Sequence, residues 1–291
     1  MITRTRTRAR TTASKSPYFP KPKPSPAPKK PKIKLASALR FPPTTAHTFG
    51  LIQESLSHDP FRLLIATIFL NKTRGVVAIP VLKRVFEAFP TVDALADADV
   101  SELTDMIRCL GFQNQRARRC VEVARAWRER EPCRGRRYAA LHYPCKGDGV
   151  GIGKGSWVGD EDDEDEDEGE GEEDGNGRVI VGWEIAHLPG LGAYALDSWR
   201  IFCRDELRGY NAGTGPTDAE FEPEWKRVRP RDKELRAYLT WMWLREGWVW
   251  NPETGERVRA NNRMRRAGRR GGVLVCGEGG KWMIERVQTP S

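Results

Sequence analysis

Long apolar runs are missing from this 291-residue sequence, and acidic residues are missing from its first 53 positions. No segment approaches the roughly 20 apolar residues that a membrane-spanning helix needs, and no secretory signal peptide is recognisable. We therefore expect no membrane partner. Cysteines are few and scattered, at positions 109, 120, 133, 145, 203 and 276. This spacing predicts reduced thiols in a cytosolic or nuclear protein rather than a disulfide framework.

The basic start of the chain predicts an arm rather than a folded domain. Residues 1–45 carry 12 lysines and arginines, many prolines, serines and threonines, and no acid. Such a segment buries too little apolar surface to fold, so we expect a disordered basic N-terminal arm that binds DNA backbone, directs nuclear import, or both. A mitochondrial presequence has a similar composition, but the prolines from Pro17 onward argue against its amphipathic helix. We predict a nuclear location, with the mitochondrion as the alternative.

Charge is distributed very unevenly along the chain. The net charge is +9, yet residues 160–174 contain 13 acids in 15 positions, and without them the remainder carries +22. Such an excess of positive charge is typical of proteins that bind polyanions, and its other interpretation is solubility alone. For the acidic run we expect a solvated loop. The alternative is a DNA mimic that competes for the basic surface.

The hydrophobic pattern predicts an all-α domain over residues 46–250. Asp59 followed by Pro60 is a good helix start, and the apolar residues that follow surround a helix that must be largely buried. A last helix is expected over residues 231–246, with its apolar side facing inward. Strand-like alternation is nearly absent before Arg178.

Two stretches depart from this helical pattern. Residues 131–180 combine a Cys/Tyr segment, a glycine-rich segment and the acidic run, and we interpret them as a long acidic loop insertion. Residues 251–291 contain seven arginines between 257 and 270, which we interpret as a basic C-terminal tail. That tail either holds DNA non-specifically or has no role.

A turn with two glycines carries most of the functional information. The segment Leu188-Pro189-Gly190-Leu191-Gly192 precedes a helix that we expect to begin at Asp197. Glycines let the backbone approach a ligand and expose successive N–H groups, which favours a nucleic-acid phosphate. Asp197 stands five residues after Gly192, either as the N-cap of that helix or as a carboxylate for chemistry on a nucleotide. The two roles are compatible.

Four blocks in this order resemble one enzyme superfamily. They run from Phe49 to Thr73, Ala78 to Leu82, Leu188 to Cys203 and Trp225 to Leu235. The sequence resembles the helix-hairpin-helix (HhH-GPD) DNA glycosylases over residues 48 to 248. Within them it is most similar to the mismatch-specific thymine/uracil glycosylases that vertebrates fuse to a methyl-CpG-binding domain. No such binding domain fits into the short N-terminal arm.

The resemblance implies a fold and a reaction. The fold would be two-lobed and helical, with a cleft between the lobes for double-stranded DNA that carries a mispaired or flipped pyrimidine. The reaction would be hydrolysis of the N-glycosidic bond of thymine or uracil opposite guanine, with Asp197 as the catalytic residue. Relatives that also cut the strand use a lysine where this chain has Tyr194, so we expect a monofunctional enzyme without β-lyase activity, acting as a monomer.

Further roles follow from the same resemblance. Gln53 falls where the superfamily has a base-pocket glutamine, and Tyr194 and Trp127 would line the same pocket. Lys72 falls where a long basic side chain enters the gap left by the flipped base, and Phe112 matches an apolar plug beside the orphan guanine. The sequence departs from the pattern at Trp127, where a tyrosine is usual. Gly190 and Gly192 of the turn would bind the DNA backbone.

We expect neither a cofactor nor a metal. Some relatives hold an iron–sulfur cluster on four closely spaced cysteines after the aspartate, but only Cys203 and Cys276 follow Asp197 here. Cys133, His142 and Cys145 could supply three zinc ligands, but no fourth ligand stands at a suitable spacing. Two other functions stay open, namely a glycosylase for another damaged base and a non-catalytic DNA-binding protein.

Overall fold

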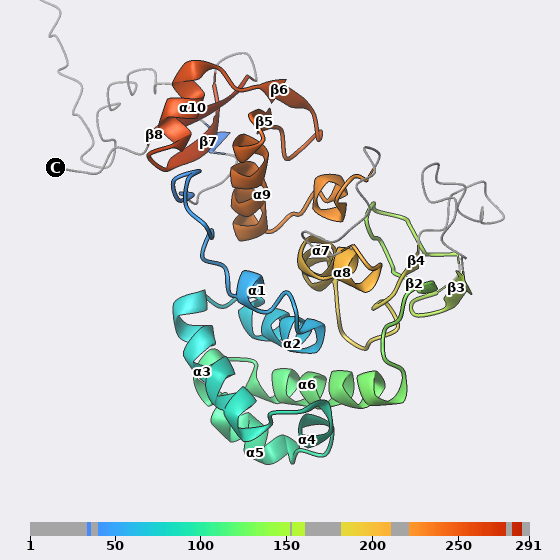
Figure 1. Ribbon diagram of the computed structural model, residues 1–291. Helices are drawn as coiled ribbons and strands as arrows, with labels where there is room; N and C mark the ends of the chain where they lie inside the picture. The colour runs from blue at the N-terminus through green and yellow to red at the C-terminus, as the bar shows by residue number, and fades with distance from the viewer. Residues whose placement is uncertain are drawn as a thin grey trace, which may run out of the picture. The chain divides into compact units, whose positions relative to one another are not determined.

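Helices dominate the regular structure of the part of the chain that this computed structural model describes, namely residues 40–151, 153–160, 182–210, 221–277 and 281–286 and the backbone of the strand Lys34–Leu35. The expectation of a mainly helical protein is confirmed there (Figure 1). The α-helices are α1 (Ile52–Ser55), α2 (Pro60–Leu70), α3 (Gly75–Ala88), α4 (Val92–Ala96), α5 (Val100–Met106), α6 (Gln113–Glu129), α7 (Ala193–Phe202), α8 (Arg204–Leu207), α9 (Lys233–Arg245) and α10 (Asn262–Gly268).

Short strands accompany these helices. Among the described residues they form a sheet in the order β3-β2-β4, a second in the order β1-β7-β8, and the hairpin β5-β6. Their bounds are β1 (Lys34–Leu35), β2 (Arg136–Ala139), β3 (Trp157–Asp160), β4 (Gly182–Trp183), β5 (Trp248–Trp250), β6 (Arg257–Arg259), β7 (Gly272–Cys276) and β8 (Trp282–Arg286). No helix in the described part of the chain is long and apolar enough to cross a membrane.

The buried helix α2 begins as its sequence predicts. The Asp59 side chain accepts a hydrogen bond from the backbone N–H of Arg62 at 2.9 Å, and Pro60 fills the first helical position, where no N–H is needed. Every residue of α2 from Leu63 to Leu70 is buried. The helix packs against α3, α6 and α7, so it forms the centre of the first hydrophobic cluster.

That first cluster also includes part of the predicted insertion. Tyr138, Tyr143 and Trp183 are buried in it together with residues of α2, α3, α5, α6 and α7. The predicted insertion is therefore attached to the helices through buried aromatic side chains, although most of its described residues are exposed or partly exposed. The acidic run lies outside the described residues except for the backbone of Asp160 at the end of β3.

A second hydrophobic cluster surrounds α9. This helix agrees with the expected 231–246, beginning at Lys233 behind an Asp232 cap and ending at Arg245. Its buried residues include Leu235, Leu239 and Trp243. They pack with side chains from β5, α10, β7 and β8.

The structure differs from the expected C-terminal tail and from the end of the expected N-terminal arm. Residues 251–286, expected as part of a basic tail, contain β6, α10, β7 and β8, because short apolar stretches in β7 and β8 bury Leu274 and Ile284 in the cluster around α9. Phe41, placed in the arm, is buried and pairs with Gly272 in a β-bridge. Residues 1–33 lie outside the described part, so the rest of the arm stays a prediction.

Two aromatic residues of α7 connect the two clusters. Tyr194 and Phe202 are partly buried and pack against both. The helix that carries Asp197 is thus held from two sides, which fixes the position of that carboxylate. The expected lobes and cleft stay predictions.

Candidate active site

The glycine turn combines two backbone conformations. Gly190 has φ +71°, in the left-handed region that favours glycine, and a Cβ there would collide with the side chain of Arg119. Gly192 is extended, has open space around it and forms the N-cap of α7. The first N–H groups of a helix have no partner within the helix, so this turn presents donors to an anion.

Asp197 lies inside α7 and not at its start. The helix begins at Ala193 behind Gly192, so the expected start at Asp197 and the N-cap role are wrong. Glycine at the cap lets the helix start immediately after the turn, which places Asp197 in the second turn. Its side chain is 5% exposed, and Oδ1 accepts a hydrogen bond from the Tyr143 hydroxyl at 2.8 Å.

The environment of Asp197 controls its protonation. Burial raises the pKa of the carboxyl to about 6, against the opposing effects of the Tyr143 hydrogen bond and the Arg200 charge. Asp232, at the start of α9, raises the pKa further. The carboxylate is therefore ionised at neutral pH but poorly solvated, as electrostatic stabilisation of a nearby cation requires.

Gln53 and Tyr194 meet, as a shared base pocket would require. Gln53 on α1 is buried, and its side-chain amide donates a hydrogen bond to the Tyr194 hydroxyl at 2.9 Å. Burial raises the pKa of Tyr194, so the phenol stays neutral. Tyr194 lies one helical turn before Asp197, which brings the Gln53 amide to the same end of α7.

Trp127 lies deeper in the protein. It is buried near the end of α6 and packs edge-on against Phe61 of α2, with ring centroids 5.5 Å apart. The contacts of its ring are with the hydrophobic cluster. Its role in the base pocket stays a prediction.

Lys72 and Phe112 are exposed and share an unusual backbone conformation. Lys72 has φ 60° and Phe112 has φ 50°, a left-handed region that is strained for such side chains. Phe112 is 67% exposed, although it is a large apolar residue. Strain of this kind persists where the surrounding structure enforces it, and it gathers at functional sites. Both residues stand at loop tips, one after α2 and one before α6.

Comparison with known proteins now gives the family. Residues 65–238 match the HhH-GPD superfamily of base excision DNA repair proteins. The chain belongs to this superfamily. The matched region includes Lys72, Phe112, Trp127, the glycine turn and Asp197, whereas Gln53 precedes it.

Three relatives illustrate the superfamily. An endonuclease III of Thermotoga maritima is 39% identical over 67 residues, which are 23% of this chain and 32% of the relative. A thymine-DNA glycosylase of Aeropyrum pernix is 34% identical over 67 residues, or 23% of this chain and 30% of the relative. A methyl-CpG-binding domain protein 4-like protein of Arabidopsis thaliana is 22% identical over 197 residues, or 67% of this chain and 28% of the relative. The chain thus spans about a third or less of each relative.

In this HhH-GPD protein, a buried ionic network supports α7, and sequence reasoning missed it. Arg200 pairs with Glu224, and Arg204 bridges Glu224 and Glu184 at 3.0 Å each. Arg200 also donates to the Tyr143 hydroxyl at 3.3 Å, so the network reaches the partner of Asp197. Burial alone would raise the pKa of Glu224, but the two arginines outweigh it and hold it below its usual value. The two arginines and two glutamates are scattered in sequence. The four-residue spacing of Arg200 and Arg204 was the only sign of the network in the sequence.

A second missed residue is Arg116, which joins the two strained loops. A charged residue on a helix is usually exposed, but Arg116 is buried, because its guanidinium satisfies the free end of α2. It donates to the carbonyls of Ile68, Phe69 and Asn71 and to the Thr73 hydroxyl. The backbone N–H of Arg116 donates to the carbonyl of Phe112 at 3.0 Å. This one residue therefore links the Lys72 loop to the start of α6.

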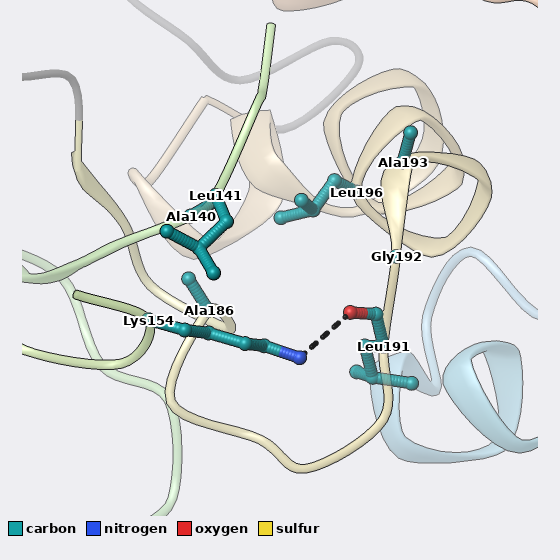
Figure 2. A pocket seen from close by; sticks show the side chains of 8 residues that line it. All are labelled: Ala140, Leu141, Lys154, Ala186, Leu191, Gly192, Ala193 and Leu196. Carbon is teal, nitrogen blue, oxygen red and sulfur yellow. Dashed lines mark hydrogen bonds between the residues drawn. The ribbon is translucent and has the colours of Figure 1, made fainter. Parts of the chain in front are cut away.

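Lys154 is a third residue without a clear sequence signal. It comes from the glycine-rich segment, and its ammonium donates to the carbonyl of Leu191 at 3.2 Å across a small cavity of about 110 Å³ beside the turn (Figure 2). Burial and the nearby Arg119 lower its pKa. Two cations therefore flank the glycine turn, which adds to its attraction for a phosphate.

The zinc site considered for Cys133, His142 and Cys145 has no support. Across the described residues, no three or more His, Cys, Asp or Glu side chains come together in a way that could hold a metal ion. Cys133 and Cys145 are exposed, and the ring of His142 accepts a hydrogen bond from the N–H of Gly147 at 3.2 Å.

Proposed function

We propose that the protein is a monofunctional DNA glycosylase that removes thymine or uracil mispaired with guanine from double-stranded DNA, in the nucleus. The observation that carries this proposal is the buried, ionised Asp197 in the second turn of α7, directly after a glycine turn suited to phosphate. A non-catalytic DNA-binding protein would have no use for a carboxylate that burial destabilises. The thymine preference draws on the resemblance to the mismatch-specific branch.

Asp197 would stabilise the transition state electrostatically. As the base leaves, positive charge builds on the deoxyribose, and a fixed carboxylate beside C1′ lowers the energy of that state and can orient the attacking water. Tyr143 holds one carboxylate oxygen in place through the 2.8 Å hydrogen bond, leaving the other oxygen for the sugar or the water. Tyr194 stands two residues after Gly192, where the strand-cutting relatives carry a lysine, so the abasic product would leave with its strand intact.

The remaining predicted residues would each act at a different point of base flipping and base recognition. Flipping a base out of the stack costs a few kcal/mol, least for a mispair, which supplies part of the selectivity. Lys72 would fill the gap, and Phe112 would wedge beside the orphan guanine, both from loops held in strained conformations. Gln53 and Tyr194 would contact the polar edge of the flipped pyrimidine, with Trp127 shaping the pocket behind it.

Single-turnover base release tests the proposal. Labelled duplexes with G·T, G·U or matched pairs would be incubated with wild type, Asp197→Asn and the exposed control Glu122→Gln, with and without alkali. We expect release only from G·T and G·U, scission only after alkali, and a loss on the order of 100-fold in Asp197→Asn alone. Scission without alkali would contradict the monofunctional assignment. Undiminished DNA binding with no release from any mispair would favour another lesion or the non-catalytic alternative.

A further inference from the structure

The C-terminal subdomain, residues 248–286, presents an arginine surface that lies beyond the region matched to the superfamily. Seven arginines and no acid occur between residues 257 and 277. All seven are exposed, although β6 and α10, which carry most of them, are anchored to the core through Met264 and Ala260. We define this arginine surface by Arg257, Arg259, Arg263, Arg265, Arg266, Arg269 and Arg270.

These arginines are held in place but not neutralised. Arg257 lies 4.0 Å from Glu222, whereas no ion pair joins the other six to a carboxylate among the described residues. Arg259 stacks on Trp248 with its guanidinium 3.9 Å from the ring centroid. Stacked and unpaired guanidinium groups keep their charge available for an anionic partner at little cost in side-chain freedom.

The two elements bring their charges together at one point. Beside Gly247, which has φ +87°, a Cβ would lie 3.3 Å from Nη2 of Arg265 and 3.8 Å from Nη1 of Arg259. Guanidinium groups from β6 and α10 therefore lie close to the same point of the backbone although like charges repel. Neighbouring phosphates of a nucleic-acid backbone would relieve this repulsion, because each provides one negative charge at a matching short spacing.

The helix α9 sets the distance of this surface from Asp197. The start of α9 is near enough for Asp232 and Arg231 to influence the pKa of Asp197, and its end leads into Gly247. The 13 residues of α9 span about 20 Å at 1.5 Å per residue. Successive nucleotides are about 3.4 Å apart along a strand, so with α9 running along the duplex this length corresponds to roughly six base pairs.

We propose that the arginine surface binds the phosphate backbone of the duplex about six base pairs to one side of the target nucleotide. The inference rests on the proposed function only in taking DNA as the polyanion. It predicts a longer footprint than the superfamily region alone would give, and binding there is independent of sequence.

Salt-dependent binding to an undamaged 30-base-pair duplex tests the surface. Arg265→Gln/Arg266→Gln should lower the slope of log K against log salt by up to about 1.8, since each lost phosphate contact contributes about 0.9. Arg265→Lys/Arg266→Lys should keep most of the slope. The matched control Lys83→Gln/Arg84→Gln removes two exposed charges from α3 and should leave it unchanged. An unchanged slope in the Gln variant, or an equal loss in the control, would overturn the proposal.

Duplex length tests the position. On a duplex with a tetrahydrofuran abasic-site analogue opposite guanine, shortening one flank from twelve to four base pairs should remove the difference between wild type and the Gln variant. A difference that survives shortening of either flank would contradict the placement. If Arg265→Gln/Arg266→Gln fails to melt cooperatively, Arg263→Gln/Arg269→Gln makes the same test.

The two proposals fail separately. Binding to undamaged DNA needs no base release, so a reduced slope without release from any mispair would keep the surface and reject the glycosylase. Base release with an unchanged slope would reject the surface alone.

Discussion

Asp197 carries its charge where charge is unfavourable, and this has a measurable effect on the stability of the fold. Burial raises its pKa from 3.8 to about 6, so the ionised carboxylate destabilises the folded state relative to the unfolded chain. The shift corresponds to roughly 3 kcal/mol. Active sites often combine function with such local instability.

We therefore expect Asp197→Asn to be more stable than wild type by up to about 3 kcal/mol at pH 7.5. A folded-state pKa above the unfolded value means that the cost of the charge is fully present above pH 6 and is lost as pH falls toward 3.8. The gain should shrink over that window and vanish below it. Urea unfolding at several pH values measures it, with the exposed Glu122→Gln as control. An equal or lower stability at pH 7.5 would show that the carboxylate is not desolvated.

The two glycines of the turn and Asp197 could be identified as a candidate site from sequence, because residue type alone restricted their role. The buried partners of Asp197 could not. Tyr143 lies 54 positions before it, in a segment interpreted as a loop insertion, and it is placed by its packing against Trp183, which in turn lies beneath Arg200 of α7. The burial of Arg116 could not be predicted for a similar reason, since a charged residue on a helix is usually exposed and only the free carbonyls of α2 explain its burial.

At the scale of elements, Arg116 makes the end of α2 and the start of α6 a single unit. Arg116→Met would keep most of the side-chain volume but leave several buried carbonyls without a donor, so we expect a loss of about 3 kcal/mol. The Lys72 loop and Phe112 would lose their fixed geometry. Base release should therefore fall even at temperatures where the variant remains folded.

Two measurements separate these effects. Chemical unfolding gives the stability, and the fluorescence of 2-aminopurine beside the mispair reports base flipping. The neighbouring Arg118→Met is the control, because Arg118 is exposed on the same helix. Normal flipping by a folded Arg116→Met would mean that the loops do not depend on this side chain.

Helices with strong local signals were predictable, and elements defined by distant contacts were not. The cap at Asp59 and the apolar pattern after it identified α2, and the pattern around Leu235 identified α9. The strands β7 and β8 were missed because the arginines before them suggested a tail, while each strand has only five residues and no alternation of apolar and polar side chains. Their stability comes from packing against α9, a contact that local sequence does not reveal.

At the scale of the whole molecule, the second hydrophobic cluster joins parts of the chain that are far apart in sequence. Phe41, α9 and the strands β7 and β8 bury side chains together, and Tyr194 and Phe202 connect this cluster to the first. A cluster with members at both ends of the described chain cannot lose one end without exposing the other. We therefore expect one cooperative unfolding transition that includes the C-terminal subdomain.

Leu274→Ala tests this cooperativity. Leu274 is fully buried in β7, so its truncation should cost 2–5 kcal/mol as an order of magnitude and lower Tm by roughly 10 °C. Val258→Ala in β6, where the side chain is 63% exposed, should change Tm very little. Calorimetry and tryptophan fluorescence should give the same lowered midpoint, because the tryptophans of α9 unfold with β7. Two separate transitions, with only the first one shifted, would instead mean that the subdomain folds independently of the helix that joins it to the active site.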